Sequence, residues 1–95
     1  MHALFVSVSI DPPGFDEAFE TLKRDVVPRV KQSPGFVAAY WFRPDQKGSA
    51  LEGTSVSVYD SEANAKQAEQ MAKNSPRPDS VTFTGFEIRE VIASA

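Results

Sequence analysis

Residues 3–14 read ALFVSVSIDPPG, and this stretch decides the fold class because it contains a complete strand and its end. Its first eight positions alternate between aliphatic side chains and the set Phe5, Ser7 and Ser9, a period of two that is typical of a half-buried strand. The DPPG that follows ends the strand, because proline cannot donate to a strand ladder and glycine permits a tight turn. A strand is therefore the first element to build on.

A helix is predicted from Phe15 to Gln32, because apolar side chains recur there at spacings of three and four residues and form one stripe. Pro28 falls inside this stretch. Proline has no N–H to bond back to the carbonyl of Arg24, so we expect a kink or a break at that point.

The rest of the chain reads as three further strands and one helix. Ser61 is a suitable N-cap for the helix, and Gly53 in the middle of a strand suggests a β-bulge. Residues 44–48 have the composition of a turn. The strands are predicted at residues 36–43, 50–59 and 81–92, and the helix at residues 62–74.

The element order is therefore strand, helix, strand, strand, helix, strand. Chains with this order usually form an antiparallel sheet with both helices on one face, which is the ferredoxin-like α+β arrangement. A length of 95 residues fits one domain. We assign that single domain to residues 1–95.

Composition excludes several classes of function. Ten Lys and Arg against 13 Asp and Glu give a net charge of −3, whereas nucleic-acid-binding domains are usually strongly basic, so we expect no nucleic acid partner. The absence of cysteine excludes disulfides, a thiolate nucleophile and a cysteine-based zinc site. His2 is the only histidine, and the chain has no nucleotide-binding motif. We therefore predict neither a metal nor another cofactor.

The chain also shows no signal for export or membrane insertion. Residues 1–10 have no basic n-region and no small-residue cleavage site. Their apolar run is shorter than the roughly 20 residues that span a bilayer. We expect a soluble, cytoplasmic protein without a membrane partner.

Two helices would leave one face of the sheet uncovered. We expect the aliphatic positions of residues 3–10 to face the helices together with Val56 and Val58. The uncovered face would then carry one of Tyr40 or Trp41 and one of Phe83 or Phe86. Its other members would be Phe5, Ser7, Ser9, Ser55, Ser57 and Tyr59.

A bare aromatic sheet face is an unusually large apolar patch for a soluble monomer. Three or four aromatic side chains at roughly 150–250 Å2 each would contribute on the order of 10 kcal/mol when buried. Association costs about 4–15 kcal/mol, so further contacts are needed, and the apolar strand at residues 36–43 could supply them. We therefore predict a homodimer in which two sheets face each other across a hollow.

We expect this hollow to bind a small, largely apolar aromatic ligand. Trp41 would stack on the ligand, or else pack in the core or the dimer interface. Tyr59 would hydrogen-bond the ligand, or else place its hydroxyl in solvent. The serines would orient a ligand or simply fill space, and no base is identifiable that could activate them, so no catalytic residue is assigned. The full set of cavity candidates is Phe5, Ser7, Ser9, Tyr40, Trp41, Ser57, Tyr59 and Phe83.

Three corner motifs carry a resemblance to a known family. They are Ser33-Pro34-Gly35-Phe36, Tyr40-Trp41-Phe42-Arg43-Pro44-Asp45 and Val58-Tyr59-Asp60-Ser61-Glu62-Ala63. Over nearly the whole chain the pattern resembles the antibiotic biosynthesis monooxygenase-like (ABM) proteins, a group of dimeric α/β barrels. The resemblance implies a homodimer with a cavity in each subunit.

The resemblance also implies a range of functions. Some family members oxidise electron-rich aromatic polyketides with O2 and no cofactor, others degrade heme, and many have no known activity. Active oxygenases of this type typically carry an Asn on the first strand and a Trp on the third, and the matching positions here are Ser7 and Tyr59. The heme-degrading branch adds a His ligand, and this chain has none beyond His2.

Two functions follow as expectations. The first is a protein that binds a small aromatic ligand and acts as a cofactor-independent monooxygenase, which is an oxidoreductase. The second is a non-catalytic binding or assembly module, in which the same sheet face only closes the dimer.

Overall fold

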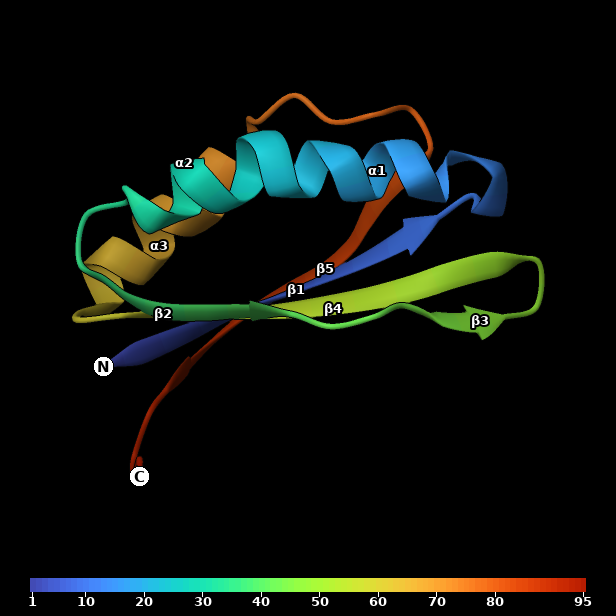
Figure 1. Ribbon diagram of the computed structural model, residues 1–95. Helices are drawn as coiled ribbons and strands as arrows, with labels where there is room; N and C mark the ends of the chain where they lie inside the picture. Colours follow the sequence, from blue (N-terminus) through green and yellow to red (C-terminus); the bar gives the residue numbers. More distant parts are fainter.

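The computed structural model describes residues 1–95 and consists of one antiparallel sheet with helices on one of its faces (Figure 1). The predicted ferredoxin-like α+β fold is confirmed. The strands are β1 (His2–Ile10), β2 (Phe36–Trp41), β3 (Asp45–Lys47), β4 (Ala50–Tyr59) and β5 (Val81–Glu90). The helical elements are a 3-10 turn η1 (Pro12–Gly14), α1 (Phe15–Thr21), a π-helical turn η2 (Leu22–Val26), α2 (Val27–Lys31) and α3 (Glu62–Lys73).

The four long strands follow the order β2-β4-β1-β5 across the sheet, so β1 and β4 are central. The short strand β3 pairs with β4 outside this path, with Asp45 opposite Glu52. The prediction of a plain turn at residues 44–48 was therefore wrong. The turn is confined to the end of this range, at Gly48, whose φ of 61° is in the left-handed region that favours glycine.

A kink or a break was predicted at Pro28; the helix does not break there, because a π-helical turn precedes the proline. In η2 the N–H of Val27 donates to the carbonyl of Leu22, five residues earlier. This wider turn changes the hydrogen-bond register just before Pro28, so the missing proline N–H leaves the helix unbroken. α1, η2 and α2 consequently run as one helical rod in Figure 1.

The pairing of β1 with β4 fixes which side chains face the helices. Leu4 lies opposite Ser57, and residues directly opposite each other share a face of the sheet. Leu4 packs with Ala65 and Ala68 of α3, and Tyr59 joins the same core cluster. Ser57 and Tyr59 therefore face the helices together with Leu4.

This register corrects two sequence-based assignments. Val56 pairs with Phe5 and Val58 pairs with Ala3, so both valines lie on the uncovered face. We expected Ser55, Ser57 and Tyr59 on the face of Phe5, but all three lie on the opposite face, toward the helices. The cause is the register: the stretch SVSVY has a valine row and a serine–tyrosine row, and only the pairing with β1 decides which row faces the helices.

The register also settles the two open choices among aromatic residues. Trp41 pairs with Ser55 and faces the helices, whereas Tyr40 pairs with Val56 on the uncovered face and is 61% exposed. The expectation that one of Phe83 or Phe86 lies on the uncovered face was wrong: both face the helices, opposite Val8 and Val6 respectively. They can do so because the β1–β5 register shifts between Ser7 and Val8, which leaves Thr84 as an extra residue.

Gly53 is not at a β-bulge, contrary to the prediction. The β1–β4 register runs without a shift through the Val8–Gly53 pair. A Cβ at Gly53 would lie 3.2 Å from a methyl group of Val8 and 3.6 Å from Pro44. Close packing against these two neighbours explains the glycine.

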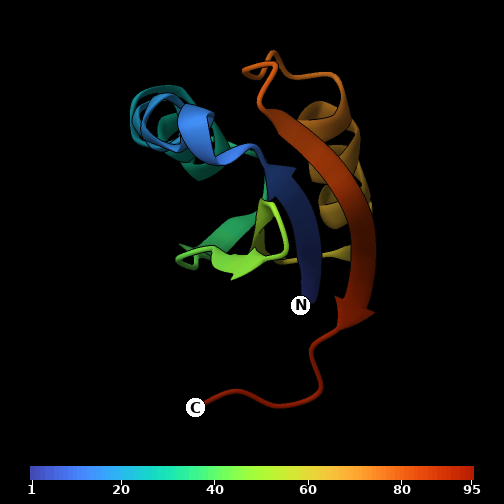
Figure 2. The same cartoon turned by 90° about the vertical axis from the view of Figure 1, so that its right-hand side faces the viewer.

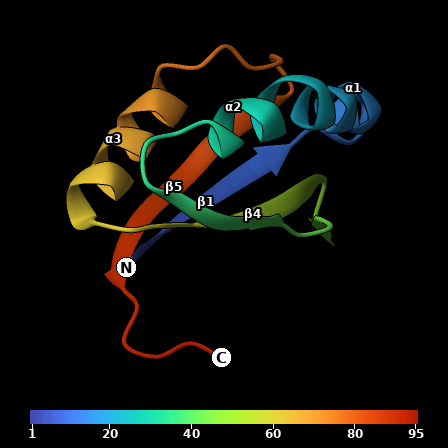
Figure 3. The same ribbon diagram turned by 60° about the vertical axis from the view of Figure 1, so that its left-hand side comes forward.

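The helices form two groups over the same sheet face (Figure 3). α3 begins at the predicted N-cap, where Ser61 Oγ accepts a hydrogen bond from the Asn64 N–H at 3.2 Å, and it packs its alanines on the sheet. Figure 2 shows the α1–α2 rod and α3 standing apart, with the loop after α3 at the top of the view on the α3 side. No helix is long and apolar enough to cross a bilayer.

Candidate functional site

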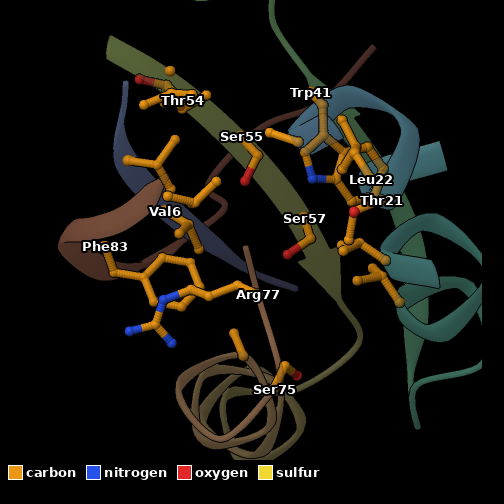
Figure 4. A pocket seen from close by; sticks show the side chains of 18 of the residues that line it. Val6, Thr21, Leu22, Trp41, Thr54, Ser55, Ser57, Ser75, Arg77 and Phe83 are labelled. Atoms are coloured by element: carbon orange, nitrogen blue, oxygen red, sulfur yellow. The ribbon is translucent and has the colours of Figure 1, made fainter. Parts of the chain in front are cut away.

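A cavity of about 420 Å3 lies between the sheet and the two helical groups (Figure 4). β1 and β4 form the floor of the cavity. The residues of β4 that lie below the gap between the two helical groups are small. Because Gly53, Ser55 and Ser57 carry little volume, the space above them stays open. The helix-facing residues of β1 that line the cavity are Leu4, Val6, Val8 and Ile10.

Aromatic rings from separate elements line this cavity. Trp41 comes from β2 and Phe83 from β5, and Phe15 and Phe19 of α1 stack on each other with centroids 5.9 Å apart. Tyr59 also lines the cavity but is only 1% exposed. Its ring packs edge-on against that of Phe36, which lies outside the cavity lining, with ring centroids 6.3 Å apart. Rings of this kind recognise flat, apolar molecules, since aromatic pairs favour offset-stacked and edge-to-face contacts.

A row of hydroxyl groups crosses the apolar floor. The hydroxyls of Ser55, Ser57 and Tyr59 belong to residues that line the cavity, and no side-chain hydrogen bond within the chain uses them. Figure 4 shows Ser55 and Ser57 side by side on β4, facing the same space as Trp41. These groups can donate hydrogen bonds to an oxygen atom of a bound molecule.

The charges around the cavity are all positive. Arg29, Arg43 and Arg77 line it, and no Asp or Glu does. The guanidinium of Arg77 lies 4.5 Å from the centre of the Phe83 ring, which is a cation–π contact. The cavity wall is thus mainly apolar and its only charged side chains are cationic, although the chain as a whole is acidic.

The titratable groups with a resolved pKa shift lie outside the cavity. A hydrogen bond from the Arg24 side chain holds the pKa of Asp25 below its ordinary value. The same bond raises the pKa of Arg24, and both groups are exposed. This pair is a surface ion pair on the helical rod and takes no part in the cavity.

No group of three or more His, Cys, Asp or Glu side chains is placed to hold a metal ion. His2, the only histidine, lies at the first position of β1, with Nε2 3.7 Å from an oxygen of Glu62. Neither His2 nor Glu62 lines the cavity. The cavity therefore offers no imidazole to a heme iron.

The structure divides the candidate residues from the sequence into two groups. Trp41, Ser57, Tyr59 and Phe83 lie together in the cavity wall. The other four lie on the uncovered sheet face, where the strand pairing points them away from the helices: Phe5, Ser7, Ser9 and Tyr40. The candidate cavity therefore lies within one protomer, and the expectation that all eight residues surround one hollow was wrong, because they lie on opposite faces of the sheet.

Part of the cavity wall has no counterpart among the sequence-based candidates. Phe15, Phe19 and Leu22 belong to the apolar stripe of residues 15–32, which is also typical of ordinary core packing, and no motif singles out Arg29 or Arg77. A signal was present in the composition of the second helix, whose packing stripe is mostly alanine. Alanine side chains bury little area, so they cannot form a continuous core with the helical rod on the other side of the cavity.

No family model matches the sequence, and no curated protein matches it. Solved structures do match. The heme-degrader MhuD from Mycobacterium tuberculosis, with two hemes in its active site, has a TM-score of 0.69 at 18% identity over 100% of this chain and 99% of its own.

Other matches extend the comparison. A dimeric ferredoxin-like protein from an uncultured marine organism has a TM-score of 0.66 at 10% identity, over 100% of this chain and 98% of its own. A Streptomyces coelicolor monooxygenase in complex with nanaomycin D has a TM-score of 0.51 at 17% identity, over 99% and 92%. The matches include a Bacillus cereus protein assigned to the antibiotic biosynthesis monooxygenases. The resemblance to ABM structures is thereby confirmed at the level of the fold.

Proposed function

We propose that this protein is a homodimer in which each protomer binds a small aromatic ligand in its cavity, and that it oxidises this ligand as a cofactor-independent monooxygenase. The observation that carries the proposal is the cavity itself. It has a volume of about 420 Å3 and combines aromatic walls with hydroxyl groups that have no partner in the chain. Its volume lies within the range of about 300–1,000 Å3 that is usual for ligand pockets.

The homodimer rests on the uncovered sheet face. Phe5, Val56 and Val58 form its centre, and Tyr40 beside them is 61% exposed. A second copy of the same face would bury this apolar surface, which soluble monomers rarely leave open. The marine ferredoxin-like protein with the same fold is dimeric, which supports this arrangement.

The oxidation needs only the substrate and O2. For an anthrone, one CH2 carbon becomes a carbonyl, one oxygen atom of O2 enters the product and the other leaves as water with the two hydrogens. The substrate supplies all four electrons that reduce O2, so the reaction needs no external reductant. Trp41 would hold the ring system flat, and the hydroxyls of Ser57 and Tyr59 would donate to the oxygen of the substrate enolate, stabilising the anion that reacts with O2.

The lining of the cavity favours a small aromatic molecule over heme as the substrate. The monooxygenase from Streptomyces coelicolor binds nanaomycin D within the same fold. MhuD holds two hemes, but the cavity here has no histidine because His2 lies outside it. Heme degradation through a histidine ligand is therefore not part of the proposal.

O2 consumption with anthrone as the substrate tests the activity. We expect uptake above the uncatalysed rate, a large loss in Trp41→Ala, and a loss of about tenfold or more in Tyr59→Phe. Tyr40→Phe is the matched control, since it removes the same hydroxyl from the opposite face of the sheet and should leave the rate unchanged. Equal rates in all variants would contradict the assignment.

The second candidate function is a binding module without catalysis. It is favoured by the absence of His, Asp and Glu from the cavity wall, since no side chain there is an evident general base. Binding of anthrone with no O2 uptake above the uncatalysed rate would support this function.

A further inference from the structure

Arg29 is the only one of the ten Lys and Arg residues that is half-buried, whereas the other nine are exposed. It lies on α2 and lines the cavity. Its guanidinium makes no ion pair and no side-chain hydrogen bond within the chain. A partly buried cation without a partner loses hydration and gains nothing in return, so its place in an apolar wall requires an explanation.

The nearest acid on the same helix does not provide that partner. Asp25 lies one turn before Arg29, but it accepts two hydrogen bonds from Arg24, at 3.1 and 3.0 Å. Arg29 contributes only the smallest of the effects that lower the pKa of Asp25. The guanidinium donors of Arg29 are therefore free for a bound molecule.

Two more arginines lie at the ends of one row across the sheet. Phe83 is opposite Val8, and Val8 is opposite Gly53. At one end of this row, Arg77 stacks on Phe83. At the other end, Pro44 packs beside Gly53, and Arg43 directly precedes Pro44 in the chain. Neither Arg77 nor Arg43 has an ion-pair partner in the chain.

The arginines that line the cavity differ from the other arginines of the chain in having no carboxylate partners. Three of the five arginines line the cavity, and none of the 13 acidic residues does. The other two, Arg24 and Arg89, are exposed and paired with Asp25 and Glu87. Arginines elsewhere in the chain thus have carboxylate partners, and those of the cavity do not.

We propose that the ligand of this cavity is an anion, namely a flat aromatic molecule that carries a carboxylate, and that Arg29 together with Arg77 and Arg43 recognises this group. The inference rests on the ligand cavity of the proposed function and adds the charge of the substrate class. The aromatic walls take the ring system. The guanidinium fork matches the two oxygens of a carboxylate, which a neutral ring system lacks.

A pair of fluorescent probes with one ring skeleton tests the charge. Anthracene-2-carboxylate carries the anion, and 2-(hydroxymethyl)anthracene is its neutral counterpart. Fluorescence titration of the full chain should give an affinity for the carboxylate at least about tenfold higher than for the alcohol, which is the range expected for a hydrogen bond to a charged group. The preference should weaken at high salt, because the mouth of the cavity is open to solvent.

Variants separate the three arginines from general charge effects. Arg29→Met and Arg77→Gln should each lower the affinity for the carboxylate about tenfold or more and leave that for the alcohol within about twofold. Arg89→Met removes the same charge outside the cavity and should change neither. Arg29→Met should also keep or raise the melting temperature of the empty protein, since it replaces an unpaired half-buried cation with an apolar side chain.

The outcomes distinguish this inference from the proposed function. Equal affinity for the two probes, or an unchanged preference in both Arg29→Met and Arg77→Gln, would overturn the anion assignment and leave the aromatic cavity standing. Failure of both probes to bind would overturn the cavity proposal as well. If Arg29→Met does not fold, the exposed Arg77→Gln decides the question alone.

Discussion

Ser57 of β4 lies directly opposite Leu4 of β1, so a buried serine shares the helix-facing side of the sheet with a core leucine. This pair explains why a cavity exists. A β-branched or aliphatic residue at position 57 would have continued the core of Leu4 across the sheet. The small hydroxyl side chain leaves that volume open beneath the helices.

Filling this space should abolish binding without harming the fold. In Ser57→Leu we expect the affinity for a neutral anthracene probe to fall by about tenfold or more, because the added side chain occupies the ligand volume. Fluorescence titration measures this, and Thr82→Leu, on an exposed strand position, is the control. Unchanged affinity would show that the ligand binds elsewhere.

The uncovered face should hold the dimer together. Tyr40→Glu places a charge at the proposed interface, where burying it without a partner costs several kcal/mol. Tyr40 is exposed in one protomer, so the protomer itself should still fold. Sedimentation at micromolar concentration should show a dimer for the parent chain and a monomer for the variant. Gln67→Glu on α3 makes the same change of charge away from this face and should remain dimeric.

Two glycines with similar φ values form a matched pair for stability. Gly35 has a φ of 72°, and a Cβ there would collide with the side chains of Asp60 and Asn64. Gly48 has a φ of 61° and open space around it. We expect Gly48→Ala to lower the free energy of unfolding by about 1 kcal/mol and Gly35→Ala by about 1–3 kcal/mol more. Urea denaturation measures both, and equal losses would contradict the steric account.

Because of the Arg24–Asp25 ion pair, we expect the free energy of unfolding to depend slightly on pH in the acid range. The pKa of Asp25 is lowered in the folded chain by the hydrogen bond from Arg24, so the unfolded state binds this proton more readily. The pair therefore stabilises the fold above the ordinary pKa of 3.8, and its contribution is lost as the pH falls through the lowered value. NMR titration of the Asp25 carboxyl should show a pKa that returns toward 3.8 at high salt. A pKa unaffected by Arg24→Gln would contradict this cause.

Local chemistry determined the elements. The period of two in residues 3–10 and the stripe in residues 15–32 depend only on neighbouring side chains, and the N-cap at Ser61 depends on its own hydroxyl. The predicted strands and helices therefore match the structure to within a few residues. The exceptions at β3 and at Pro28 also have local causes, a hairpin at Gly48 and a π-helical turn.

Pairing between distant segments decided the site. Which of two alternating rows in SVSVY faces the helices depends on its register with β1, and the side of Phe83 depends on a register shift at Ser7 and Val8. A register slip of one residue would exchange the two faces of the strand. The sequence of a single strand does not specify its partner strand or its register. The elements and the α+β class were thus determined by the sequence itself, whereas tertiary structure alone decided that the cavity lies beneath the helices and that Arg29 lines it.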